Sequence, residues 1–182
     1  MDAKITRKTK ETQIELSLDL RGGVSRISVP VQFLEHMLGS FAKHSGAAIQ
    51  LSAKSLDKDE HHLVEDVAIT LGQAVRKAVA DRKIARFGQQ VIPMDDALVA
   101  CALDLGGRPY FEGTLPDPIY EHFLRSFAFE AGLTLHMDVI RGRDPHHIVE
   151  AAFKSLARGL KQAWQPTTDV QSTKGEVELS GG

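Results

Sequence analysis

The feature that most constrains the fold is an internal repeat at an interval of 85 residues. Residues 61–78 and 146–163 align as HHLVEDVAITLGQAVRKA over HHIVEAAFKSLARGLKQA, with six of eighteen positions identical. The same interval places Asp19 on Asp104, and with one residue's adjustment His36 falls on His122. Because a fixed repeat interval indicates a repeated structural unit, we interpret the chain as a tandem duplication of one unit of about 85 residues.

Hydrophobic periodicity predicts the same elements in each half. Alternating apolar residues predict a strand over residues 14–20, and its counterpart is the apolar run over 97–105. Short helices are expected over 33–41 and 123–127, further strands over 49–53 and 133–139, and long one-faced helices over 64–78 and 149–163. This mixture predicts an internally duplicated α+β fold, in which each half has a mainly antiparallel sheet with helices packed on one face.

The repeat also sets the expected domain organisation. We expect a first half over residues 1–90 and a second half over 91–165, each with one HHxxE motif. Residues 166–182 have little periodicity and predict a C-terminal loop or tail that carries the STKG sequence.

Composition excludes several classes of protein. The chain has 24 acidic and 22 basic residues without long runs of one sign, so a nucleic-acid-binding surface is not expected. The single cysteine, Cys101, excludes an intramolecular disulfide and fits a reducing compartment. The first fifteen residues contain no apolar signal region, and the longest apolar run, 97–103, is too short to cross a bilayer. We therefore expect a cytoplasmic protein without a membrane or nucleic-acid partner.

The histidines of the repeat form a set of metal-competent groups. His61 and Glu65 are four residues apart and share one helix face, whereas His62 is rotated by about 100° and can serve a different partner. Together with the histidine of the short helix, each half of the chain therefore contains three histidines and one glutamate. These residues are His36, His61, His62 and Glu65 in the first half, and His122, His146, His147 and Glu150 in the second. The duplication retains every one of these groups, which favours a pair of metal sites with ligands drawn from both halves or from two subunits.

The types of ligand do not determine which metal is bound. Imidazole-rich sites suit zinc, iron, nickel or copper at least as well as manganese. A closed tetrahedral zinc site uses only four protein ligands, fewer than the candidate groups in this chain. We therefore expect metal sites with coordination positions open to substrate.

Two other metal proteins were weighed on the same residues. A dinuclear metallohydrolase needs a carboxylate that bridges two metals about 4 Å apart, but each motif has only one glutamate among several histidines. A di-iron storage bundle uses Glu-x-x-His on an all-helical chain, whereas this chain has His-His-x-x-Glu interleaved with strands. Both are ranked below an enzyme that binds substrate on the metal.

The motifs resemble a known family. FLEHMLGSFAKH (33–44), DEHHLVED (59–66), DLGGRPY (104–110), EHF (121–123), HHIVEAAFK (146–154) and STKG (172–175) closely resemble imidazoleglycerol-phosphate dehydratase, an enzyme of L-histidine biosynthesis. The resemblance extends from about Arg7 to Gly175 in order.

The resemblance implies an activity, a metal and an assembly. The activity is that of a carbon–oxygen lyase (hydro-lyase) that dehydrates D-erythro-imidazole-glycerol phosphate to imidazole-acetol phosphate. It implies Mn²⁺, with two ions per subunit, a homo-oligomer of 24 subunits, and active sites at subunit contacts. The eight groups above would be the metal ligands.

Further residues are implied to contact substrate. Glu11 is the implied substrate contact and first candidate for the catalytic acid/base, and its repeat counterpart Asp96 is a weaker alternative. The implied substrate and phosphate contacts are Glu11, His36, His44, Arg86, Arg108, Lys154, Ser172 and Lys174. Considered singly, Arg86 could equally be a solvated cation at a helix end, and Gly106–Pro109 only a turn.

The chemistry explains why such residues are needed. The reaction removes a hydrogen from the carbon beside the imidazole. No carbonyl group is next to this carbon to acidify the hydrogen, so the reaction cannot proceed through an enolate. A metal on a ring nitrogen favours the imidazolate, which can expel the hydroxyl and give a diazafulvene-like intermediate. A positioned acid/base must then move the protons.

Overall fold

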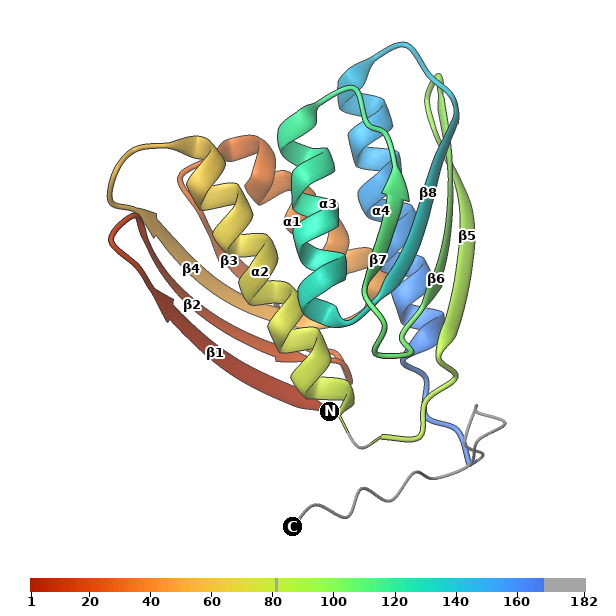
Figure 1. Ribbon diagram of the computed structural model, residues 1–182, viewed down its shortest axis with the longest axis horizontal. Coiled ribbons are helices and arrows are strands. Elements are labelled where there is room, and N and C mark those ends of the chain that lie inside the picture. The colour runs from red at the N-terminus through yellow and green to blue at the C-terminus, as the bar shows by residue number, and fades with distance from the viewer. Residues whose placement is uncertain (81, 169–182) are drawn as a thin grey trace.

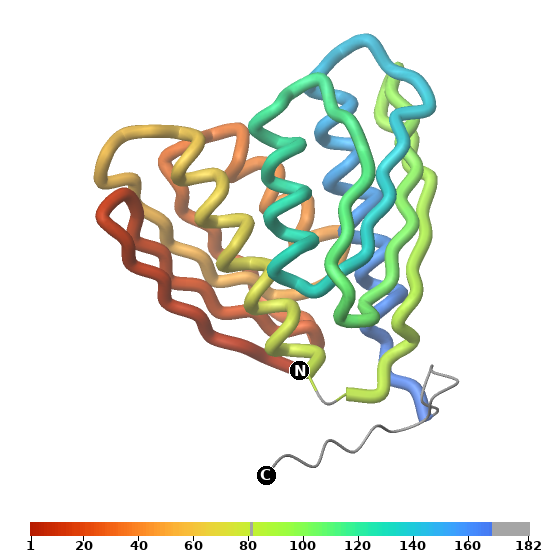
Figure 2. Tube along the Cα trace, in the orientation of Figure 1, coloured from red at the N-terminus to blue at the C-terminus, as the bar shows by residue number. Residues whose placement is uncertain are grey.

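Two four-stranded sheets enclose four helices in the part of the chain that the structure describes. The structure is a computed structural model, and it describes residues 1–80 and 82–168. The sheets form the two outer layers and the helices lie between them (Figures 1 and 2). The first sheet has the order β1-β2-β4-β3 and the second the order β5-β6-β8-β7. The α+β fold with helices on one face of each sheet is confirmed.

The two sheets have the same topology. The strands of the first are β1 (Asp2–Lys8), β2 (Thr12–Asp19), β3 (Arg26–Ser28) and β4 (Ala48–Ser55); those of the second are β5 (Phe87–Met94), β6 (Ala97–Asp104), β7 (Tyr110–Gly113) and β8 (Thr134–Arg141). In each sheet the first three strands in spatial order pair antiparallel, and the short edge strand β3 or β7 pairs parallel. Strand β5 crosses the half boundary expected at residues 90 and 91, so the second sheet begins earlier, at Phe87.

The helices of the two halves also correspond to one another in length and in their end residues. They are α1 (Gln32–Ser45), α2 (Glu60–Val79), α3 (Pro118–Ala131) and α4 (Pro145–Ala163). Helices α1 and α3 both have 14 residues and end at glycines in the left-handed region, Gly46 and Gly132, which lack the Cβ that disfavours this conformation. Helices α2 and α4 begin after Asp59 and Asp144, whose carboxylates accept the backbone N–H of the second helical residue.

The helices of the two halves interlock. Helix α1 packs against α4, and α2 packs against α3, so each short helix lies beside the long helix of the other half (Figure 1). Phe41 of α1 and Phe127 of α3 meet at the centre with ring centroids 6.1 Å apart, and both are fully buried. Burial of these apolar faces from both sides fixes the histidines of one half against those of the other.

The four edge strands β1, β3, β5 and β7 were not predicted from the sequence, because β1 and β5 alternate weakly and β3 and β7 are only three and four residues long. On β1, the positions that face the helices are Ala3, Ile5 and Arg7. On β5, Val91 points outward and is exposed, and Pro93 is tolerated because an edge strand leaves one backbone side unpaired.

Candidate metal centres and substrate-binding residues

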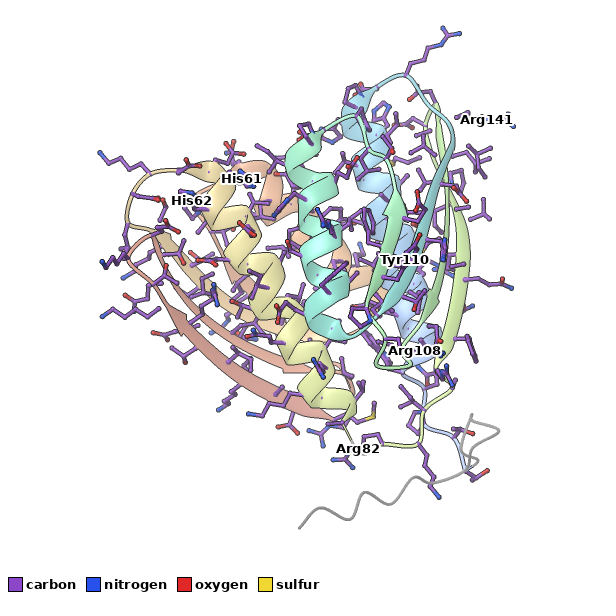
Figure 3. The ribbon with its side chains drawn as sticks, in the orientation of Figure 1. His61, His62, Arg82, Arg108, Tyr110 and Arg141 are labelled. Atoms are coloured by element: carbon purple, nitrogen blue, oxygen red, sulfur yellow. The ribbon has the colours of Figure 1, made fainter. Side chains whose placement is uncertain are left out.

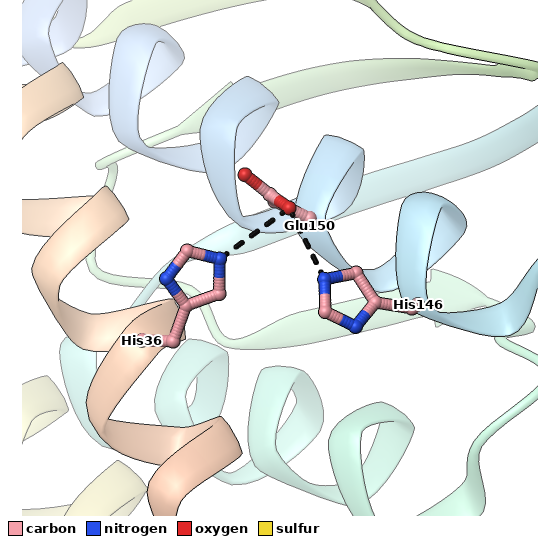
Figure 4. Close-up of side chains that lie close together, drawn as sticks. All are labelled: His36, His146 and Glu150. Atoms are coloured by element: carbon pink, nitrogen blue, oxygen red, sulfur yellow. Dashed lines mark ion pairs between the residues drawn. The ribbon is translucent and has the colours of Figure 1, made fainter.

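The first candidate metal centre combines residues from both halves. His36 Nε2 of α1 lies 3.5 Å from Glu150 Oε2 of α4, and His146 Nε2 lies 3.4 Å from the same oxygen (Figure 4). The two rings are half-exposed, whereas the Glu150 carboxylate is buried at their base. Burial alone would raise the pKa of Glu150, but the hydrogen bond from Lys154 and the nearby charges lower it, which keeps an anion at the base of the centre.

The second centre is the mirrored arrangement. His61 and Glu65 of α2 meet His122 of α3, and the ligand atoms of this trio all lie within 4.8 Å of one another. His122 Nε2 is 3.0 Å from Glu65 Oε1, yet its geometry forms no hydrogen bond and the nitrogen is buried. Buried polar atoms are ordinarily satisfied, so this nitrogen has the environment of a ligand whose partner is a cation.

His62 and His147 do not join either centre. His62 Nδ1 lies 2.6 Å from Asp57 Oδ2, and His147 Nδ1 lies 2.7 Å from Asp96 Oδ1. These contacts raise the pKa of both imidazoles, with the aspartate hydrogen bond as the main cause. They also occupy Nδ1 of each ring, as the carboxylate does in carboxylate–histidine–metal triads. The other ring nitrogen of His147, Nε2, lies 3.3 Å from Asp95 Oδ2.

The two candidate acid/base carboxylates have different surroundings. Glu11 lies in the turn between β1 and β2, with Oε1 3.9 Å from His62 Nδ1 and half of the side chain exposed. Asp96, its counterpart, accepts from His147 and from the backbone N–H groups of Arg143 and Asp144. These bonds lower the pKa of Asp96 to about 2, the His147 contact being the largest cause. Asp96 is therefore engaged as an acceptor, whereas Glu11 is available.

The arginines lie far from the histidines within one subunit. Arg86 directs its guanidinium at both carboxylate oxygens of Asp104, and Arg108 Nη2 lies 3.8 Å from the same group. The Arg86 backbone N–H donates to Ala163, the last residue of α4, whereas His146 lies at the start of that helix. Seventeen residues of α-helix span about 25 Å. Figure 3 shows Arg108 at the opposite end of the molecule from His61 and His62.

Arg86 and Arg108 thus differ in their availability. Arg86 is held in a paired, half-buried position with a positive φ of 71°, so it is not a freely solvated cation. Arg108 is 79% exposed and presents its guanidinium at the protein surface. Within the subunit, Arg86 is paired with Asp104, and Arg108 is the more exposed of the two arginines.

The remaining predicted contacts divide by location. Lys154 Nζ lies 2.8 Å from Glu150 Oε1, so it adjoins the first centre. His44, two turns after His36 on α1, has a lowered pKa caused by burial and by the nearby charges of Lys154 and Arg158. Ser172 and Lys174 lie outside the described residues.

Sequence reasoning missed two aspartates. Asp57 contacts His62, and Asp66 is a buried carboxylate on α2. Asp57 has no carboxylate counterpart in the second half, where position 142 is glycine, so the repeat gave no signal for it. Asp66 occupies the apolar side of α2, where its charge could have been noticed as unusual.

Comparison with known protein families gives a match over most of the chain. The family model described as imidazoleglycerol-phosphate dehydratase matches residues 29–160. The chain belongs to this family. The matched range contains all eight histidine and glutamate ligands proposed from the repeat.

Relatives of the family match over nearly the whole chain. The imidazoleglycerol-phosphate dehydratase of Lactococcus lactis subsp. cremoris (strain SK11) is 48% identical, over 99% of this chain and 96% of that protein. The enzyme of the same name from Clavibacter michiganensis subsp. michiganensis is 45% identical, over 96% of each chain.

Solved structures of imidazoleglycerol-phosphate dehydratases have the same fold. The structure from Pyrococcus furiosus, in complex with (S)-C348, superposes with a TM-score of 0.84 at 35% identity, covering 95% of this chain and all of that one. The Staphylococcus aureus structure superposes with a TM-score of 0.82 at 34% identity, covering 92% of this chain.

No helix among the described residues is long and apolar enough to span a membrane.

Proposed function

We propose that this protein catalyses the dehydration of D-erythro-imidazole-glycerol phosphate to imidazole-acetol phosphate in histidine biosynthesis. The observation that carries the proposal is the pair of mirrored centres, His36 with His146 and Glu150, and His61 with Glu65 and His122. Each centre combines two imidazoles and one carboxylate from opposite halves. The free, buried thiol of Cys101 supports a reducing cytoplasmic setting for the enzyme.

We propose Mn²⁺ as the cofactor, with one ion in each centre and two per subunit. The donor set fits a divalent transition metal because imidazole nitrogens and a carboxylate oxygen converge in both places. The buried His122 nitrogen without a hydrogen bond supports the fit independently. A bound divalent metal would supply Lewis acidity toward the imidazole of the substrate and a template for its orientation.

Separate centres argue against a dinuclear hydrolase. Among the described residues, three groups of metal-competent side chains are found, and no carboxylate is shared between them: Glu150 belongs to the first centre, Glu65 to its mirror, and Glu11 and Asp57 to a group around His62. A two-metal hydrolytic site requires metals about 4 Å apart, and these sites usually share a bridging carboxylate. Two separate, mirrored centres are better suited to binding the imidazole ring of the substrate.

We propose that the complete active site forms between subunits of a 24-subunit assembly. His62 and His147 lie outside both centres, and an aspartate contacts Nδ1 of each ring. Each ring can therefore offer Nε2 to a centre on another subunit, and for His147 this replaces a 3.3 Å contact of Nε2 with Asp95 Oδ2. The distance between the arginines and the histidines along α4 supports the same arrangement, because one subunit cannot bring Arg108 to its own centres. The number 24 is an implication of the family resemblance.

The proposed roles of the individual side chains combine their positions with the family resemblance. Arg108 binds the phosphate through charge-assisted hydrogen bonds, since its guanidinium is exposed. Ser172 and Lys174 of the STKG sequence are proposed as further phosphate contacts on the resemblance alone. Lys154 and His44 adjoin the first centre and contact the substrate there. Glu11 exchanges protons with the carbon beside the imidazole and with the departing hydroxyl, since its carboxylate is exposed and near His62.

A metal-reconstitution assay tests the function. The protein is stripped with chelator, and turnover of imidazole-glycerol phosphate is measured as Mn²⁺ is added back. We expect imidazole-acetol phosphate to form in proportion to bound metal, up to two ions per subunit. Metal uptake without product would favour a storage role, and release of phosphate in place of dehydration would favour a hydrolase.

A further inference from the structure

A buried ionic network joins helix α2 to the β1–β2 hairpin. The Asp66 carboxylate is buried, with its residue only 6% exposed. Arg7 Nε on β1 donates to its Oδ1 at 2.7 Å, and the Thr12 hydroxyl at the start of β2 donates to its Oδ2. Because Asp66 lies one helical turn after His62, the helix that carries His62 also holds both strands of the hairpin.

The network continues into the turn that carries Glu11. Thr9 Oγ1 accepts the backbone N–H groups of Glu11 at 3.1 Å and of Thr12 at 2.9 Å. The Glu11 carbonyl accepts from Leu56 N at 2.7 Å. Within the described residues, no hydrogen bond holds the Glu11 carboxylate itself. The position of that carboxylate is therefore set through the backbone of the turn.

In the second half, apolar residues occupy the positions equivalent to this ionic network. The repeat counterparts of Arg7, Thr12 and Asp66 are Ile92, Ala97 and Ala151, and the strand registers match, since Arg7 faces Ile14 and Ile92 faces Val99. Ala97 and Ala151 are buried. In this half the carboxylate of Asp96 is bound directly by two backbone N–H groups and by His147.

This contrast separates stability from function. A buried ion network is often no more stabilising than well-packed apolar residues, because desolvation of the charges offsets their attraction. The apolar arrangement in the second half provides a native example at the equivalent position. The ionic version in the first half therefore calls for a role other than holding the fold together.

We propose that Asp66, with Arg7 and Thr12, is a positioning group that fixes the Glu11 turn relative to His62, so that the first half supplies the proton-transferring carboxylate while Asp96 in the second half serves as a fixed acceptor. The proposal deepens the proposed function and rests on the role of Glu11 in it. Asp66 acts through Glu11 and does not itself contact the substrate.

The test replaces the three residues of the network with the residues at the equivalent positions of the second half. The triple variant Arg7→Ile/Thr12→Ala/Asp66→Ala replaces the network with its own repeat counterparts. The matched control, Asp19→Ala/Arg21→Ala, removes an exposed ion pair at the far end of the same two strands. Melting temperature, bound Mn²⁺ and oligomeric state are measured for both, and both are expected to remain close to the parent.

The first readout is amide hydrogen exchange, which does not depend on activity. In the triple variant, the amides of Thr9, Glu11 and Thr12 should exchange at least about tenfold faster, because the turn loses its anchor on α2. The β5–β6 turn and the control variant should be unchanged. Unaltered protection of the Glu11 turn overturns the proposal, whether or not the protein proves to be a dehydratase.

The second readout is a double-mutant cycle on turnover. We expect kcat of the triple variant to fall about 10- to 100-fold, as for a misplaced catalytic group, with KM changed less than about threefold. In a Glu11→Gln background the same three substitutions should cause almost no further loss. Losses that multiply in the two backgrounds would show an effect independent of Glu11 and overturn the positioning role. An inactive parent enzyme would instead refute the proposed function, and the exchange result would separate the two failures.

Discussion

His36 Nε2 and Glu150 Oε2 lie 3.5 Å apart, although the two residues belong to opposite halves of a duplicated chain. The pairing arises because α1 packs against α4, and the mirrored pairing of His122 with Glu65 arises because α3 packs against α2. The duplication thus gives two centres, each assembled from both halves. Loss of one ligand should therefore affect one centre and leave the other able to bind.

Replacing a ligand of one centre should halve the metal content. For His36→Ala we expect bound Mn²⁺ to fall to about half of the parent value, because the centre loses one of its few ligands while its mirror is intact. Turnover should be abolished. Metal analysis by mass spectrometry after dialysis measures the first effect. His136→Ala, an exposed histidine on β8 outside both centres, is the control and should retain the parent metal content. Full metal content in the His36 variant would contradict its assignment as a ligand.

The two histidines outside the centres should control assembly. We expect His62→Ala or His147→Ala to abolish turnover, weaken metal retention and shift the protein toward smaller species, because each side chain is proposed to complete a centre on another subunit. Analytical ultracentrifugation with and without Mn²⁺ measures the effect. Asp57→Asn retains His62 but weakens the acceptor at Nδ1, and it should lower metal affinity about 10- to 100-fold. An unchanged assembly with normal metal content would show that neither histidine is a metal ligand or an assembly contact.

The exposed arginine should bind the phosphate. Arg108→Ala removes a side chain that is 79% exposed, so we expect little change in melting temperature but a rise in KM of at least about tenfold. Steady-state kinetics measure it. Arg82→Ala, which removes another exposed arginine at the same end of the molecule, is the control (Figure 3). An unchanged KM for Arg108→Ala would indicate that Gly106–Pro109 is only a turn.

Two glycines should respond to alanine in opposite directions. A Cβ at Gly88 would lie 2.0 Å from the Gly159 carbonyl oxygen, so Gly88→Ala must separate β5 from α4 and should lower the free energy of unfolding by about 3 kcal/mol or more. Gly39 lies inside α1 with nothing within 4 Å of its added Cβ, so Gly39→Ala should stabilise by about 0.5–1 kcal/mol. Thermal and urea unfolding measure both. Similar effects at the two positions would refute the close contact between β5 and α4.

Acid should weaken one ion pair of the first sheet. Hydrogen bonds from Arg21 lower the pKa of Asp19 from 3.8 to about 2. A lowered folded-state pKa stabilises the protein above the unfolded pKa, so this contribution is complete above pH 4 and is lost as pH falls toward 2. Because the pair is partly exposed, its size should stay below about 1 kcal/mol. Urea unfolding of Asp19→Asn and the parent between pH 2 and pH 6 measures it. A stability difference that does not shrink at low pH would contradict the linkage.

The repeat accounts for most of what could be predicted. The amphipathic helices and the central strands depend on local spacing, and the structure confirms them. All four edge strands were missed: β1 and β5 because their inward positions include Arg7 and Gly88, and β3 and β7 because they are only three and four residues long. Local apolar alternation carries no signal where the buried face is completed by a charge or by a backbone contact.

The sequence by itself determined the types, number and duplication of the candidate metal-binding groups, because these depend on side-chain chemistry and helical period. Only the tertiary structure decided that His36 meets Glu150, that Asp57 and Asp96 hold His62 and His147 by Nδ1, and that Arg86 is paired with Asp104. Such contacts depend on which helix packs against which. That choice follows from burial of apolar faces over the whole chain, and burial is not directional, so no motif encodes it locally.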